Sequence, residues 1–178
     1  MKNMKKLIRI FDSISFCGAA FASAVLAAGL LLILVEIFMR TALNSTTYIA
    51  TEYPGYICAA VSFMGLGYTL SLNGHIRMSF VFLLLKGKPG IVWNILIHLI
   101  GFVVSACLIV ISWDFFYASY TNGTVSMKIT QTPLAVPQFF IFLGTIILTL
   151  QFISETCKLV FMLKGDENIK VAEGSEFI

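Results

Sequence analysis

Charged residues divide the chain into four long uncharged runs. The runs hold 23, 24, 25 and 26 residues and lie between these charged pairs: Asp12 and Glu36, Glu52 and Arg77, Lys88 and Asp114, Lys128 and Glu155. A helix needs about 20 apolar residues to cross the hydrocarbon of a bilayer. The pattern therefore predicts an all-α integral membrane protein with four transmembrane helices, at about residues 14–38, 52–73, 91–113 and 133–155.

Local signals support the ends of two of these helices. Glu52 and Pro54 suit the start of the second helix, because an acidic side chain complements the positive helix end and proline loses no hydrogen bond in a first turn. Trp93 and Trp113 lie 20 residues apart in the third run, which is ~30 Å along a helix. That distance equals the hydrocarbon thickness, and tryptophan prefers its two interfaces.

The two ends of the chain lie outside these runs. Residues 1–12 interleave lysine and arginine with apolar residues, which is typical of a short amphipathic helix on the membrane surface. Residues 166–178 mix acidic and basic residues without periodicity, and we expect a disordered tail there. The chain is thus expected to form a single four-helix membrane domain over residues 1–165.

Lysine and arginine are distributed unequally over the two sides of this topology. Of the 12 such residues, ten fall on the side of both termini, and only Arg40 and Lys128 fall on the other. Short loops rich in lysine and arginine remain in the cytoplasm. We therefore expect both termini to be cytoplasmic.

The composition agrees with a membrane protein and excludes other classes. Hydrophobic residues make up 58% of the 178 residues and charged residues only 12%, against roughly 45–50% and about 25% in soluble domains. The mean hydropathy is +0.92. A net charge of +3 is too mild to indicate a nucleic-acid partner. Ordinary soluble domains, disordered chains and nucleic-acid binders are excluded on these grounds.

Small residues and cysteines are predicted to serve helix packing. The first run repeats Gly, Ala and Ser four residues apart, as in Gly18 and Ala22, which either allows close helix contact or reflects the helix propensity of alanine. The four cysteines fall one to each expected helix, without a CxxC pair: Cys17, Cys58, Cys107 and Cys157. We expect them to be small apolar residues packed in the helices rather than metal ligands or disulfides.

Ionisable residues within a membrane are candidates for function by default. Here every Asp, Glu, Lys and Arg lies at an end of an expected helix or outside it, so no charged relay is expected to cross the chain. Glu36 and Arg40 are four residues apart, in the favourable order for an ion pair on a helix. Glu52 follows across a short loop, and we expect Arg40 to clamp the two helix ends. The alternative is that Arg40 contacts lipid headgroups or a soluble partner protein.

The sequence offers little support for a cofactor or for catalysis. A haem between two helices needs two axial imidazoles at a similar depth, but His98 lies ~10 Å deeper than His75 if each is in a spanning helix. We also find no Ser-His-Asp arrangement, no paired buried carboxylates and no glycine-rich phosphate loop. We therefore expect no catalytic residue, no metal site and no bound cofactor.

Several marks occur in a fixed order between the first and the fourth run. Arg40 closes the first run, and a short polar segment leads to Glu52 at the start of the second. The remaining marks are Gly65 and Gly67 midway through the second run, Gly74, His75, Ile76 and Arg77 after it, and Thr132, Pro133 and Pro137 at the entry to the fourth. In this order, and with four spans in a chain of this length, the sequence resembles the small membrane subunit of tripartite ATP-independent periplasmic (TRAP) transporters, the DctQ-like family.

This resemblance implies a function for the chain that composition alone does not. It implies a non-enzymatic subunit in the inner membrane of a bacterium, without a substrate site of its own. Its partners would be the large membrane subunit of the same transporter, a periplasmic solute-binding protein and membrane lipid. The assembly would import an organic acid, of the C4-dicarboxylate or sialic acid class, in a sodium-coupled process, with this subunit as the static scaffold. Candidate structural or partner-contact residues are Glu36, Arg40, Glu52, Gly74, His75, Arg77, Pro133 and Pro137.

Two other classes of function remain open at this stage. A membrane anchor of a redox enzyme would carry haem, and a Soret band in the purified protein would support it. A four-span structural membrane protein of the cell-adhesion type would carry glycans on the outer-loop sequons at Asn44 or Asn122.

Overall fold

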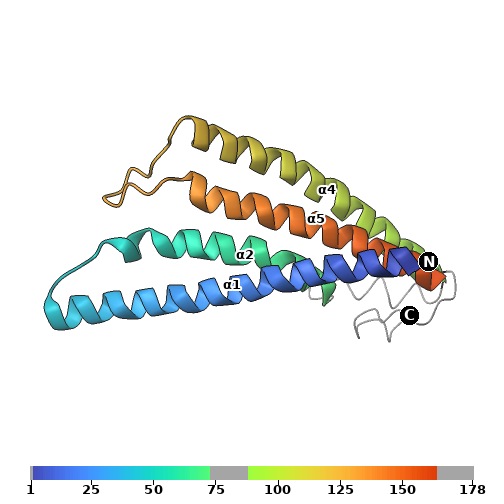
Figure 1. Cartoon of the computed structure of the whole chain (residues 1–178), viewed down its shortest axis with the longest axis horizontal. Helices are drawn as coiled ribbons and strands as arrows, with labels where there is room; N and C mark the ends of the chain where they lie inside the picture. The colour runs from blue at the N-terminus through green and yellow to red at the C-terminus, as the bar shows by residue number, and fades with distance from the viewer. Residues whose placement is uncertain (1, 73–87, 164–178) are drawn as a thin grey trace.

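The computed structural model describes residues 2–72 and 88–163, and the described chain is helical (Figure 1). Its elements are α1 (Lys2–Leu43), the short 3₁₀ helix η1 (Ile49–Thr51), α2 (Tyr53–Ser71), α4 (Lys88–Thr121) and α5 (Ala135–Leu163). Three of them, α1, α4 and α5, are long and apolar enough to cross a membrane. The described chain is thus that of an all-α protein with several helices able to span a bilayer. Four spans, with α2 as the second, remain a prediction.

The first helix differs from the expected pair of elements. We expected a surface helix over residues 1–12 followed by a separate span, but α1 runs without interruption for 42 residues. The reason is visible in the sequence, because no glycine or proline occurs before Gly18 to break the helix where the charged segment meets the apolar one. At 1.5 Å per residue this helix is ~63 Å long, about twice the hydrocarbon thickness.

Helix α5 holds the other helices together. Figure 1 shows the order α4, α5, α2 and α1 across the molecule, with the N-terminal part of α1 lying against α5. Helix α5 therefore contacts α4 on one side and both α2 and α1 on the other. The connection between α1 and α2 and the connection between α4 and α5 lie at the same end of the molecule, and the N-terminus lies at the opposite end (Figure 1).

Small residues allow the helices to approach closely. The buried face of α1 includes Gly18 and Ala22, and Ala22 packs with Met64 of α2 and Ile147 of α5. A Cβ atom added at Gly18 would lie 3.0 Å from the carbonyl oxygen of Met64, which is tighter than ordinary contact. At these positions the small residues are contact sites between helices, and not merely good helix formers.

The helices turn polar side chains inward and large apolar side chains outward. The buried polar residues of α4 and α5 include Asn94, Ser105, Ser112, Thr145, Thr149 and Gln151. The outward faces of α1 and α4 carry exposed leucine, isoleucine, valine and phenylalanine side chains, for example Leu30, Leu34, Val103 and Ile111. This arrangement suits a hydrocarbon solvent, where buried polar groups hydrogen-bond between helices and lipid covers the apolar surface.

The cysteines are placed differently from the expectation. Cys17, Cys58 and Cys107 are exposed, and only Cys157 is partly buried. A thiol is apolar enough to sit on an outward helix surface of this composition, so burial is not required. All four are free thiols.

Candidate functional site

The carboxylate of Glu36 organises the connection between α1 and α2. Although Glu36 sits near the end of α1, it is only 3% exposed. Its oxygens accept hydrogen bonds from Arg40 Nε at 2.8 Å, from the Thr46 hydroxyl at 2.6 Å, and from the backbone N–H of Thr47 at 3.2 Å. The Thr47 hydroxyl donates as well. The predicted Glu36–Arg40 ion pair is therefore confirmed, and it also fixes the following loop.

Glu52 has a separate set of partners at the start of α2. It is buried, and it accepts hydrogen bonds from the hydroxyls of Tyr56 and Thr130. Lys128 Nζ donates to the backbone carbonyl of Thr51 at 2.7 Å. These contacts tie the start of α2 to the connection between α4 and α5, a link that the sequence did not predict.

The electrostatics of Glu52 follow from these neighbours. Burial by itself raises the pKa of the Glu52 carboxyl. Hydrogen bonding by Ser126 and Tyr56, together with the positive charge of Lys128, outweighs burial and leaves the pKa below its ordinary value. Glu52 is thus held as a carboxylate that joins two connections of the protein.

Arg40 does not join the two helix ends in the way we expected. Its contact in the described chain is Glu36, one turn away on the same helix, and its side chain is 51% exposed. Glu52 is instead surrounded by Tyr56 and Thr130. An i,i+4 partner is always within reach on a helix, whereas a contact across the loop requires a particular loop path. Glu36 and Glu52 therefore form two neighbouring polar clusters, each with its own cation nearby.

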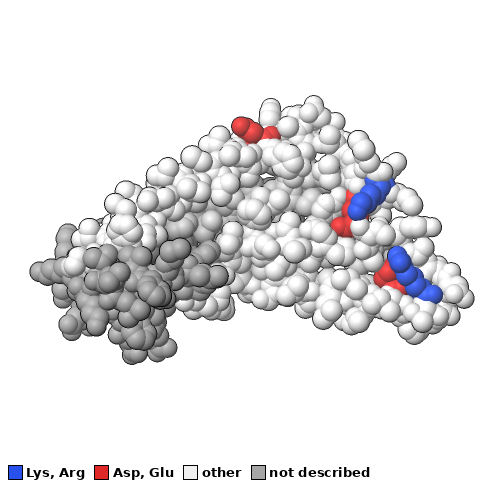
Figure 2. Space-filling model, turned by 180° about the vertical axis from the view of Figure 1, so that it is seen from behind, with Lys and Arg blue, Asp and Glu red and all other residues white. Residues whose placement is uncertain are grey.

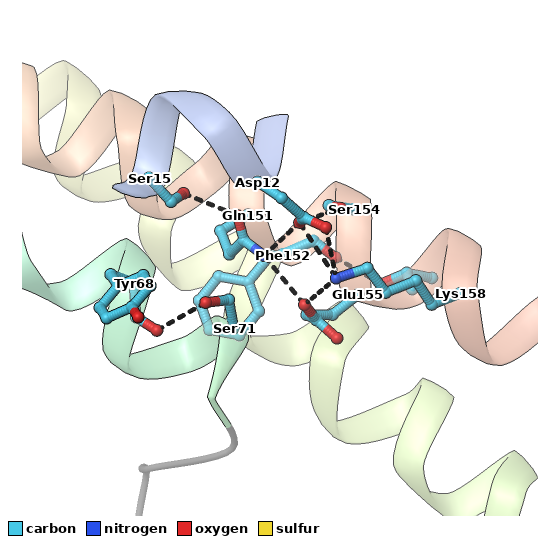
Figure 3. A network of polar contacts seen from close by, with 10 residues as sticks. Asp12, Ser15, Tyr68, Ser71, Gln151, Phe152, Ser154, Glu155 and Lys158 are labelled. Carbon is cyan, nitrogen blue, oxygen red and sulfur yellow. Dashed lines mark hydrogen bonds and ion pairs between the residues drawn. The ribbon is translucent and has the colours of Figure 1, made fainter. Parts of the chain in front are cut away.

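A third polar cluster, absent from the sequence analysis, joins α1 to α5 near the N-terminal end (Figure 3). We call it the six-residue network, and it consists of Asp12, Ser15, Gln151, Ser154, Glu155 and Lys158. Gln151 is at its centre, accepting from the Ser15 hydroxyl at 2.6 Å and donating to both Asp12 and Glu155 at 2.9 Å. The network thus connects residues more than 130 positions apart in the sequence.

Lys158 supplies the positive charge of the six-residue network. Its Nζ lies 2.9 Å from Asp12 Oδ2 and 2.8 Å from Glu155 Oε1, so it bridges two carboxylates on two helices. Ser154 adds a hydroxyl donor to Asp12 at 3.0 Å. Two carboxylates and one ammonium leave the cluster with a formal charge of −1. The side chains of Gln151, Ser154 and Lys158 stabilise this charge by donating five hydrogen bonds to the two carboxylates.

The burial of this network corrects one expectation from the sequence. We expected every charged side chain to lie at an end of an expected helix or outside it, and none to be buried, but Glu155 is 2% exposed and Lys158 is 6% exposed. Helix α5 continues past the expected end at residue 155, so both side chains lie within the helix rather than beyond it. A signal was present in the sequence: polar residues recur at 151, 154, 155 and 158, the spacing of one helix face.

The remaining predicted residues lie apart from these clusters or outside the described chain. Gly74, His75 and Arg77 fall outside the described residues, as does the expected tail over 166–178. Pro133 pairs with Val125 in an isolated bridge before α5, and Pro137 is buried in the first turn of that helix. Pro133 thus ends the connection that carries Lys128 and Thr130, and Pro137 lies at the start of α5.

His98 is buried between α4 and α5. Its Nδ1 lies 2.8 Å from the carbonyl oxygen of Asn94, and its ring makes an edge contact with Phe152, with centroids 6.0 Å apart. These two contacts are typical of a histidine that packs in the interface between two helices. In residues 2–72 and 88–163 no three His, Cys, Asp or Glu side chains come together in a way that could hold a metal ion.

The three clusters share one chemical property. Each buried carboxylate accepts several hydrogen bonds from donors of the protein itself, which is the arrangement of a structural contact rather than of an open ligand site. Figure 2 shows a described surface that is mostly uncharged on the face drawn, with the blue Lys and Arg atoms lying next to red ones. The clusters sit at the two ends of the helices, with long apolar surfaces between them.

Comparison with known proteins identifies one family. A sequence model of the DctQ component of tripartite ATP-independent periplasmic transporters matches residues 29–162. No curated protein and no solved structure matches the chain. The matched segment contains Glu36, Arg40, Glu52, Glu155 and Lys158, whereas Asp12 of the six-residue network precedes it.

Proposed function

The chain belongs to the DctQ family, whose members are a component of TRAP transporters, and we propose that it is the static scaffold subunit that binds and stabilises the large membrane subunit. A transporter component with helices able to span a membrane is a multi-pass membrane protein rather than an enzyme.

The observation that carries the scaffold proposal is the central position of α5. This helix contacts the other three α-helices of the described chain, α1, α2 and α4, and hydrogen bonds and an ion pair fix it to α1 through the six-residue network. Ser112 of α4 and Thr145 of α5 add a contact at 3.2 Å on the opposite side of α5. Helices joined in this way resist sliding past one another, because each shift breaks buried polar contacts. A rigid unit of this kind suits a support for a moving partner.

The outward apolar faces support an assignment to a membrane complex. Helices α1 and α4 expose rows of large apolar side chains along most of their length, such as Leu26, Leu31, Val104 and Val110. In a bilayer such a face is covered by lipid or by a partner helix. In the proposed complex the large subunit covers part of it, and the residues of 1–165 act as one unit.

The proposed topology places both termini in the cytoplasm and the Glu36 and Glu52 clusters on the periplasmic side. It rests on the ten-to-two distribution of lysine and arginine. The compartment is then the bacterial inner membrane. The periplasmic clusters lie on the side where a solute-binding protein would deliver the organic acid.

Sodium coupling and substrate recognition are assigned to the partner. Among the described residues, the carboxylates of Glu36, Glu52 and Glu155 are engaged by donors of this chain. A sodium site would need such oxygens to be available to the ion. We therefore propose that the large subunit holds the sodium and organic-acid sites, with a C4-dicarboxylate or a sialic acid as the class of substrate.

Co-purification with the large subunit tests the scaffold proposal. The tagged chain and its untagged large subunit are co-expressed and extracted in a mild detergent, and the large subunit is also purified alone. We expect a stoichiometric complex in which the large subunit unfolds at a higher temperature than it does by itself. A large subunit that does not co-purify, or that gains no stability, would contradict the proposal. A Soret band in the purified chain would point to the redox anchor instead.

A further inference from the structure

An open groove of about 630 Å³ runs along the N-terminal half of α1. It is formed where α1 meets α2 and α5, and its lining includes Lys6, Arg9, Ile10, Ile14, Cys17 and Gly18 of α1 with Met64 of α2 and Ile147 of α5. The volume lies within the range of ligand sites, about 300–1,000 Å³. None of the three polar clusters accounts for this groove, and its surface is mainly apolar.

The polarity of the groove changes from one end to the other. Lys6 and Arg9 lie at the N-terminal end, and from Ile10 onward its lining is almost entirely apolar, with Ser13 as the exception. Both cations are exposed, and neither has an ion pair or hydrogen bond within residues 2–72 and 88–163. The nearest acid along the helix, Asp12, is already engaged by Lys158, Gln151 and Ser154. The two positive charges are therefore not compensated by the described chain.

The length of the groove matches one leaflet of a bilayer. Lys6 and Gly18 are 12 residues apart on a continuous helix, which corresponds to ~18 Å. One leaflet contributes about 15 Å of hydrocarbon, half of the total thickness. A molecule with an anionic head and an apolar tail of this length would place its head at Lys6 and Arg9 and its tail toward Met64 and Ile147.

We propose that this groove binds an anionic phospholipid of the bilayer. The phosphate contacts Lys6 and Arg9, and one acyl chain lies against Ile10, Ile14 and Cys17. Basic pockets between transmembrane helices on the cytoplasmic side are suited to anionic headgroups. In the topology proposed above, the lipid belongs to the inner leaflet. The site is independent of the transported substrate and holds even if the chain supports a different partner.

Native mass spectrometry of the full chain in detergent tests this site. The chain is titrated with phosphatidylglycerol and, separately, with phosphatidylcholine carrying the same acyl chains. We expect phosphatidylglycerol to bind about 30-fold more tightly, and the Lys6→Gln/Arg9→Gln variant to lose this preference. Thirty-fold equals ~2 kcal/mol, from ~1 kcal/mol for each cation near an anionic lipid.

A matched pair of cysteine variants tests the apolar part of the site. Cys17→Trp fills the groove without changing charge, and Cys107→Trp makes the same change on an exposed surface of α4. We expect Cys17→Trp to weaken phosphatidylglycerol binding at least tenfold and Cys107→Trp to leave it unchanged. Both cysteines are exposed, so circular dichroism should report an intact fold for each variant. Equal binding of the two lipids, or equal behaviour of the two tryptophan variants, would overturn the proposal.

Discussion

Replacing Lys158 by methionine should lower the stability of this protein substantially. The ammonium group contacts Asp12 at 2.9 Å and Glu155 at 2.8 Å, and both Lys158 and Glu155 are almost fully buried. Methionine keeps the length and apolar stem of the side chain but removes the only cation of the six-residue network. Two carboxylates on neighbouring helices then face one another without a positive charge between them.

The size of the effect follows from the burial of each partner. Removing one member of a buried ion pair costs about 3–5 kcal/mol, because the other charge is left without compensation. The Asp12 side chain is 37% exposed, so water screens its share and the lower end of that range, about 3 kcal/mol, applies. For a chain of this size that corresponds to a decrease of about 6–12 °C in melting temperature.

Thermal unfolding in detergent micelles, followed through the fluorescence of Trp93 and Trp113, measures this decrease. Lys128→Met is the matched control, because Lys128 is exposed and its loss should cost less than about 1 kcal/mol. The double variant Glu155→Gln/Lys158→Met should be more stable than Lys158→Met alone, since it no longer buries an uncompensated charge at Glu155. The reasoning is refuted if Lys158→Met unfolds at the temperature of the control, or if the double variant shows the sum of two independent losses.

Three further predictions concern packing, pH and topology. Gly144→Ala should destabilise the protein by about 1–3 kcal/mol, because the new Cβ would lie 2.5 Å from the backbone of Phe63. Gly65→Ala is the control and should be neutral or slightly stabilising, because the space at that position is open. Chemical denaturation measures the free energy of unfolding of both variants and distinguishes them. The difference in melting temperature between the wild type and Glu52→Gln should be constant at pH values above the ordinary pKa of a glutamate, and it should shrink as the pH falls below that value. The reason is that the pKa of Glu52 is lowered in the folded protein, so its stabilising negative charge is lost only as the pH passes through this lower pKa. A difference that has already disappeared near pH 6 would contradict this. A reporter fused near Asn122 should be active in the periplasm and one at the C-terminus in the cytoplasm, and the reverse result would exclude the four-span topology.

The sequence predicted the helices better than the contacts between them. Uncharged runs locate helices because the bilayer requires about 20 apolar residues whatever those residues pack against. The Glu36–Arg40 pair was predictable for a similar reason, since both residues lie on one helix. The continuity of α1 was missed because charge was taken as a boundary, although no helix-breaking residue separates residues 1–12 from the apolar run.

The six-residue network could not be derived from local patterns. Asp12 and Lys158 are 146 positions apart, and their contact depends on which face of α1 meets α5. The polar spacing on α5 was visible, but a polar stripe near a helix end is equally compatible with exposure to water. Likewise, the partners of Glu52 come from the connection before α5, and the path of that connection is a property of the tertiary structure.

Sodium-driven uptake in proteoliposomes tests the scaffold account most directly. Vesicles contain this chain alone, the large subunit alone, or both, and each set receives the solute-binding protein loaded with its organic acid under an inward sodium gradient. The account predicts uptake at full rate only with both membrane subunits and none with this chain alone. Uptake by this chain without the large subunit, or full uptake by the large subunit without this chain, would contradict it.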